Sequence, residues 1–180
     1  MSELEDLIAR AQSYEQAFLA RPEGIENLFY YGDWDDGKLN QWWRALLATT
    51  TKGLKELDGG QQCLVYASKH YVLKLRHNVA GCHIDLRKSP DQALLEICKQ
   101  YSEACKETRW CDPVAATYFL LFDYLTPQGL AAVQKRVDCS YKARLAAGAL
   151  FFGIDPYLVR CNHATNYGMD GERPVYIDWD

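Results

Sequence analysis

The chain lacks long apolar runs, and its amino terminus lacks the pattern of a signal peptide. No apolar run reaches the roughly 18 residues of a membrane helix. The opening segment MSELEDLIARAQSYEQ is acidic and amphipathic, whereas a signal peptide needs a basic and then an apolar segment. We therefore expect no membrane association and a cytoplasmic location, or delivery into another cell by a route without a cleaved signal peptide.

The chain also lacks blocks of like charge. Acidic and basic residues are interleaved, the net charge is −4, and no run of five or six residues carries one sign. Nucleic-acid binding relies on clustered basic residues that neutralise phosphates. We therefore expect no nucleic-acid partner.

Cysteines are present, but not in the patterns of a disulfide scaffold or a zinc site. Their number is seven, which is odd, and none forms a CxxC pair, so we expect reduced thiols that pack as small hydrophobic side chains. The one zinc set that can be assembled has unusual ligand spacings; its members are Cys82, His83, Cys161 and His163.

Length and composition are those of an ordinary folded domain with a helical amino-terminal part. The 180 residues are 48% hydrophobic, which predicts one main core. Apolar residues at helical spacing predict amphipathic helices over residues 4–19 and 39–49. Trp42 and Trp43 could form a partner surface, but core packing is favoured because so much apolar area is costly in water.

The middle of the chain has the pattern of antiparallel strands. Residues 54–57, 63–66 and 71–75 predict three strands, with a turn at Asp58-Gly59-Gly60. Ser89-Pro90-Asp91 is typical of a helix start, because the serine caps, the proline suits the first turn and the acid suits the positive end of the helix dipole.

The rest of the chain mixes both element types. The apolar run 114–122 predicts β structure that breaks at 123–127, residues 129–152 are expected to be mostly helical, and 174–178 predict a short strand. The fold class is therefore α+β.

The order of these elements resembles the protein kinase and aminoglycoside phosphotransferase superfamily. The segment from His163 to Asp180 is similar to the family's catalytic loop, hairpin and metal-binding turn. The resemblance implies a kinase-like fold in three parts. These are an amino-terminal helical extension (1–53), a small antiparallel β-rich N-lobe (54–126) and a reduced helical C-lobe (127–180).

The resemblance also implies ATP and Mg²⁺ as cofactors and assigns residues to them. Lys74, Glu96 and Asp178 would be catalytic, with Lys74 on the α- and β-phosphates and Glu96 as its helical partner. Asn166 and Asp178 would bind the metal. The nucleotide would contact five residues: Gly59, Gly60, Val65, Lys74 and Tyr124.

The residue types suit this chemistry independently of the resemblance. Mg²⁺ bound to a triphosphate needs oxygen ligands, which Asp178 and Asn166 offer, and the phosphates need a cation, which Lys74 offers. A lysine within an apolar strand is costly to bury unless it is paired. The alternative is that Lys74 faces solvent on an edge strand.

Three departures from the family pattern argue against efficient catalysis. The turn after Leu57 keeps two glycines but lacks the last glycine of GxGxxG. Cys161 stands five residues before Asn166, where the family has its catalytic aspartate, and Asp155 lies eleven residues before Asn166. The sequence ends at Asp180, before the segment that would bind a protein substrate.

Three functional interpretations remain. The first is a catalytically impaired, pseudokinase-like module that binds nucleotide and acts through a protein partner, as a phage product or secreted effector would. The second is a minimal ATP-dependent phosphotransferase, since phosphoryl transfer depends chiefly on positioning and charge stabilisation. The third is an unrelated α+β interaction domain.

Overall fold

The chain divides into two units of mixed α and β structure. The computed structural model describes residues 1–21, 37–59, 63–76, 118, 120, 122–154 and 167–177. For residues 37–40, 58 and 59 only the backbone is described. The first unit comprises Met1–Arg87 and Phe122–Arg136, and the second comprises Lys88–Leu121 and Val137–Asp180. The α+β class is confirmed.

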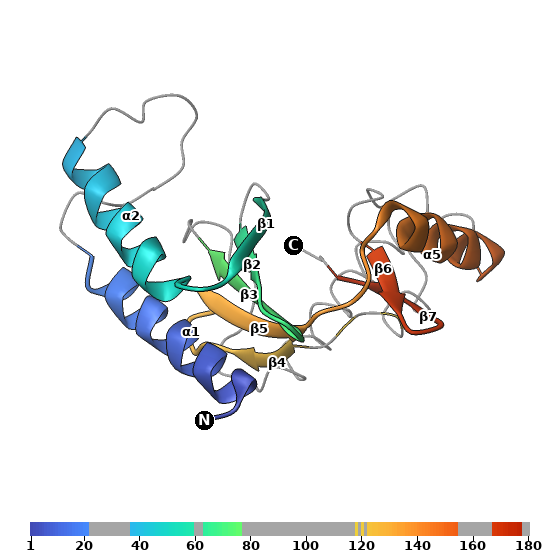
Figure 1. The fold of residues 1–180 in the computed structure, drawn as a ribbon, viewed down its shortest axis with the longest axis horizontal. Coiled ribbons are helices and arrows are strands. Elements are labelled where there is room, and N and C mark those ends of the chain that lie inside the picture. Colours follow the sequence, from blue (N-terminus) through green and yellow to red (C-terminus); the bar gives the residue numbers. More distant parts are fainter. Residues whose placement is uncertain are drawn as a thin grey trace, which may run out of the picture. The chain divides into compact units, whose positions relative to one another are not determined.

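The first unit is built on a five-stranded antiparallel sheet with the order β1-β2-β3-β5-β4 (Figure 1). Its strands are β1 (Lys55–Gly59), β2 (Cys63–Ala67), β3 (Tyr71–Arg76), β4 (Phe122–Leu125) and β5 (Ala131–Lys135). Strand β3 lies in the centre, paired with β2 on one side and β5 on the other. The chain leaves the sheet after β3 and returns at its edge as β4.

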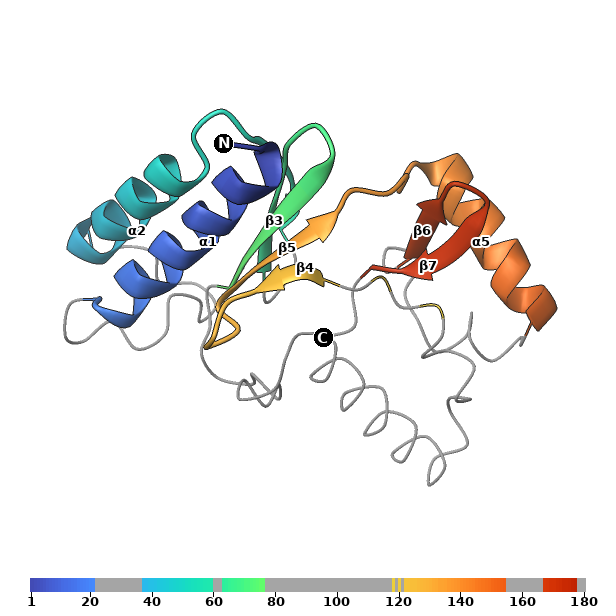
Figure 2. The ribbon, with the colours of Figure 1, turned by 90° about the horizontal axis from the view of Figure 1, so that it is seen from below.

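Two helices lie side by side along this sheet, with α1 (Glu3–Leu19) against β3 and β5 and α2 (Gly37–Thr50) beside α1 (Figure 2). Helix α1 starts with a capping box, in which the Ser2 hydroxyl accepts from the Glu5 amide and the Glu5 carboxylate accepts from the Ser2 amide. The expected packing of the amino-terminal helices on the rest of the chain is confirmed.

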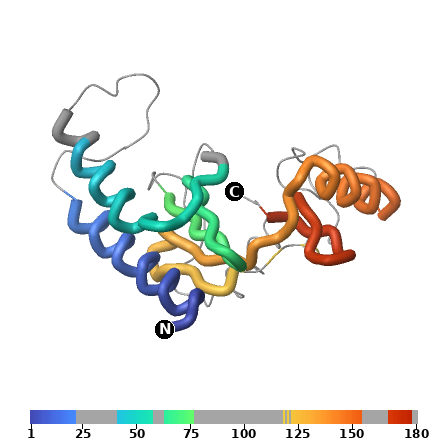
Figure 3. The backbone as a smooth tube through the Cα atoms, viewed as in Figure 1, coloured from blue at the N-terminus to red at the C-terminus, as the bar shows by residue number. Residues whose placement is uncertain are grey.

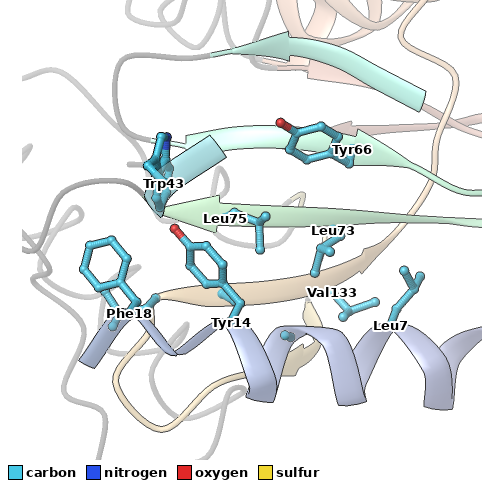
Figure 4. Close-up of a cluster of buried hydrophobic side chains, with 11 residues drawn as sticks. Leu7, Tyr14, Phe18, Trp43, Tyr66, Leu73, Leu75 and Val133 are labelled. Atoms are coloured by element: carbon cyan, nitrogen blue, oxygen red, sulfur yellow. The ribbon is translucent and has the colours of Figure 1, made fainter. Parts of the chain in front are cut away.

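The core of the first unit lies between α1, α2 and one face of the sheet (Figure 4). Trp43 is only 3% exposed, and its ring lies 5.8 Å from that of Tyr14 in an edge-to-face arrangement, which confirms a core role for this tryptophan. The side chains labelled in the close-up are Leu7, Tyr14, Phe18, Trp43, Tyr66, Leu73, Leu75 and Val133.

The helix expected over residues 129–152 is wrong in its first part, because residues 131–135 form β5. Ala131 and Val133 belong to the core on the α1 side, while Ala132 and Gln134 alternate with them and are also buried. A strand buried on both faces has a continuous apolar sequence without alternation, and such a sequence does not distinguish it from a buried helix.

The turn predicted at Asp58-Gly59-Gly60 also differs from the structure, because Asp58 and Gly59 still belong to β1. Gly59 pairs with Leu64, and the register shifts between Glu56 and Gly59. This irregularity lets the strand continue past the first glycine. Residues 60–62 lie outside the described part of the chain.

The second unit contains α5 (Tyr141–Ile154) and the hairpin of β6 (Tyr167–Asp170) and β7 (Arg173–Tyr176), with α5 lying against the hairpin (Figure 3). The Phe151 ring stacks on that of Tyr176 at 4.5 Å. Strand β7 confirms the strand predicted from Pro174. Among the described residues, no helix has the length and apolar character needed to cross a membrane.

Candidate functional site

Lys74 lies on the central strand of the sheet, on the face opposite α1. Its neighbours in β3, Leu73 and Leu75, are fully buried in the core beneath α1. Since side chains alternate along a strand, Lys74 points to the other face. The edge-strand explanation for Lys74 is wrong, because β3 pairs on both sides.

The residues beside Lys74 follow from the strand register. Val65 on β2 and Ala132 on β5 are its direct cross-strand neighbours, and Leu125 on β4 is the next residue in the same row. These residues define what we call the Lys74 face. The structure thus brings together two of the predicted nucleotide contacts, Val65 and Lys74.

Phe122 on β4 also contributes to the Lys74 face. The Lys74 ammonium nitrogen lies 5.9 Å from the centroid of the Phe122 ring, at the outer limit of a cation–π contact. The sequence interpretation missed this residue, because the apolar run that ends at Phe122 shows no alternation that would assign it to a face.

The Lys74 face combines apolar side chains with a cation. Lys74 itself is half-buried, and Val72, Ala132 and Gln134 around it are buried. A charge in such surroundings interacts more strongly with an anion than a charge in bulk water does. The Lys74 face thus places one cation among mostly apolar side chains.

Tyr124 does not belong to this face. It pairs with Val133, packs partly buried against the α1 core, and its hydroxyl accepts a hydrogen bond from the Gln12 side chain at 3.0 Å. The reason is the strand irregularity between Phe122 and Tyr124, together with the alternation of side chains. The structure therefore does not bring Tyr124 together with Lys74.

The other predicted site residues have no described side chain. Gly59 ends β1, where its backbone pairs with Leu64. The remaining predicted site residues lie outside the described residues, as does Cys161; they are Gly60, Glu96, Asn166 and Asp178. Within the described residues, no group of three or more His, Cys, Asp or Glu side chains could hold a metal ion.

Two side chains of α1 fix the strands that carry the site. The Tyr14 hydroxyl donates to the Arg76 carbonyl at the end of β3, and burial raises the pKa of Tyr14, so this hydroxyl stays a donor. The buried Glu15 carboxylate accepts from the Gln128 amide at 3.0 Å and from the Leu130 amide at 3.3 Å, in the turn between β4 and β5.

The hairpin of the second unit is held by a close backbone approach at Gly168. A Cβ on Gly168 would lie 2.6 Å from the Asp138 carbonyl oxygen, so this position has no room for a side chain. Asp138 and Met169 exchange backbone hydrogen bonds beside it. The Asp138 carboxylate accepts from the Ser140 amide, which lowers the pKa of Asp138 and fixes the start of α5.

Comparisons with family models, with curated proteins and with solved structures find no match to this chain. The proposed function therefore rests on the sequence and geometry of the chain's own residues.

Proposed function

We propose that the chain is a kinase-like nucleotide-binding protein with impaired catalysis that acts through a protein partner. The observation that carries the proposal is Lys74 on β3, beside Val65 on β2. In protein kinases, the lysine that contacts the ATP phosphates also lies on the third strand, next to the strands of the glycine-rich turn.

The order of elements supports the same interpretation. Between β3 and β4 the sequence holds the segment that starts at Ser89 and carries Glu96, the proposed partner of Lys74. Strands β4 and β5 then complete the antiparallel sheet, and α5 follows. The strand found at 131–135 in place of a helix leaves this order intact.

The hairpin of the second unit supports the proposed metal ligands. Tyr167 pairs with Tyr176 at the end of the hairpin where the sequence continues, in one direction to Asn166 and in the other to Asp178. Carboxylate and amide oxygens are suitable ligands for Mg²⁺ bound to a triphosphate.

The proposal is tested by titrating ATP with and without Mg²⁺ and following the melting temperature. A ligand that binds only the folded state stabilises it by about 2.7 kcal/mol at a hundredfold excess over Kd. We therefore expect the melting temperature to rise with ATP, and to rise further with Mg²⁺. An unchanged melting temperature at millimolar ATP would remove the nucleotide from the proposal.

Impaired catalysis is the part of the proposal that depends on Cys161. A thiol with a pKa near 8.5 is mostly protonated at neutral pH and is a poor replacement for an aspartate base. We expect no transfer of radioactive γ-phosphate to protein substrates by the wild type, and a gain of transfer in Cys161→Asp.

The minimal-phosphotransferase alternative predicts a different result in the same assay. The wild type would then transfer γ-phosphate, to itself or to an added protein, and Asp178→Asn would abolish the signal because the metal ligand is lost. Labelling that survives Asp178→Asn would point to a contaminating kinase and is the control for both interpretations.

A further inference from the structure

Helix α5 is apolar on the side that faces away from its own hairpin. Its inner side is buried through Ala143, Ala147 and Phe151. On the outer side, Tyr141 is 77% exposed, and Leu145 and Phe152 are each 56% exposed. A surface helix normally has a polar outer side, and a helix that is apolar all round is normally covered all round.

The exposed apolar residues of α5 form one continuous stripe. Tyr141, Leu145, Ala149 and Phe152 recur at intervals of four, four and three residues, which places them on one side of the helix. Such spacing is that of a helix seam that pairs with another helix. We call these four residues the α5 stripe.

The charged residues of α5 are distributed unevenly along the helix, and this favours one orientation of a second helix on the α5 stripe. Its only charged residues are Lys142 and Arg144, both in the amino-terminal half. The Arg144 guanidinium donates to the Cys139 carbonyl at 2.7 Å, whereas Lys142 is exposed and makes no ion pair within the described residues. The last turn contains no basic residue to balance the negative end of the helix dipole.

We propose that the α5 stripe is a self-association surface, through which two copies of the chain pair with their α5 helices antiparallel. In this arrangement Lys142 of each copy lies near the carbonyl end of the other copy's α5, where a cation is favourable. Leu145 then lies opposite Ala149, a large side chain against a small one, and Tyr141 lies opposite Phe152.

The occupant is a second copy because the α5 stripe complements itself. A two-fold axis at the middle of the stripe sets Leu145 of each copy against Ala149 of the other and brings the carbonyl end of each α5 to the other copy's Lys142. An isologous dimer interface requires such self-complementarity. The pairing does not depend on nucleotide binding. A 14-residue helix is about 21 Å long, so we expect a contact smaller than the roughly 800 Å² per partner of a standard interface, and a weak dimer that dissociates in the micromolar range.

The first test is the molar mass of the whole chain by sedimentation equilibrium, over roughly 1 to 300 µM. The wild type should change from monomer to dimer within this range. Leu145→Lys should weaken dimerisation about tenfold or more, because it buries a charge in the contact. Leu19→Lys is the matched control, since Leu19 is 53% exposed at the end of α1 and should leave the dimer unchanged.

The second test determines the antiparallel arrangement. Ala149→Glu alone should weaken the dimer as Leu145→Lys does. Mixing the two variants should restore association, because the lysine introduced in one copy then lies opposite the glutamate introduced in the other. Melting curves that match the wild type show that the variants are folded. A wild type that is monomeric throughout, a dimer insensitive to Leu145→Lys, or a mixture that associates no more strongly than either variant alone overturns the proposal.

Discussion

Among single residues, Lys74 has surroundings that an ordinary surface lysine lacks. It projects from the central strand onto a face where Val72 and Ala132 are buried, with the Phe122 ring near its ammonium group. Lys55, on the edge strand β1, is exposed. The difference between these two lysines of one sheet offers a direct comparison for any anion that binds this protein.

Glu3 makes a residue-scale contact that gives stability a pH dependence. Its carboxylate accepts from the His70 amide at 2.8 Å and contacts the His70 ring at 2.7 Å, which joins the start of α1 to the turn between β2 and β3. The hydrogen bonds from the His70 amide and from the Ser68 and His70 side chains lower the pKa of Glu3 from 4.5 to about 2.

We predict that Glu3→Gln loses stability at neutral pH but not in acid. Because the folded state lowers the pKa of Glu3, the stabilisation is present above pH 4.5 and is lost as the pH falls toward about 2. Melting temperatures of variant and wild type should therefore differ at pH 6 and converge near pH 2. Glu172→Gln, at an exposed turn position between β6 and β7, is the control. A difference independent of pH would contradict the assignment.

Only part of the candidate site could be predicted from the sequence. That part follows from the alternation of side chains along strands and from the order of elements in the family that the chain resembles. Lys74 and Val65 were assigned from their order along the chain, and the antiparallel register brings them together. Tyr124 was assigned in the same way but packs on the α1 side, because the irregularity in β4 determines which residues face Lys74. A strand irregularity depends on pairing between strands, which a single sequence does not show.

Among elements, α1 is both a layer of the core and a support for the turn between β4 and β5. Its apolar residues Leu7, Ala11, Tyr14 and Phe18 are buried at helical spacing. Glu15, next to Tyr14, is also buried and accepts the amide hydrogens of Gln128 and Leu130. A surface turn is thereby fixed by a helix more than 100 residues away in sequence.

We predict that Glu15→Ala destabilises the protein by about 1 to 3 kcal/mol, because it leaves buried amide groups without their acceptor. Gln16→Ala, at the next and exposed position of α1, should change stability by less than about 0.5 kcal/mol. Urea unfolding of the two variants measures the difference. Equal effects of the two substitutions would show that the Glu15 contact contributes nothing to stability.

Most elements with a clear hydrophobic pattern were predicted correctly, but β5 was not, and β4 (Phe122–Leu125) occupies part of the segment 123–127 where a break was predicted. The spacing of Leu7, Phe18 and Trp43 predicted helices that pack on the rest of the chain, and both helices contribute to the core of the first unit. Ala131-Ala132-Val133-Gln134 has no such pattern, and residues on both of its faces are buried. Burial on both faces is a tertiary effect that overrides local propensity.

For the whole molecule, the two units contribute different surfaces to the proposals. The first unit contains the Lys74 face, and the second contains the α5 stripe. Nucleotide binding and self-association can therefore be tested separately. A Leu145→Lys variant should bind ATP with wild-type affinity, and a Lys74→Ala variant should dimerise normally.

The most direct test of the central claim is the affinity for ATP–Mg²⁺ of Lys74→Ala compared with Lys55→Ala and the wild type, by calorimetric titration. Loss of a charge-assisted contact of about 1.5 to 3 kcal/mol should weaken binding by roughly 10- to 100-fold in Lys74→Ala. Lys55→Ala should bind as the wild type does. Equal affinity of all three proteins, or no binding by the wild type, would contradict a nucleotide site at Lys74.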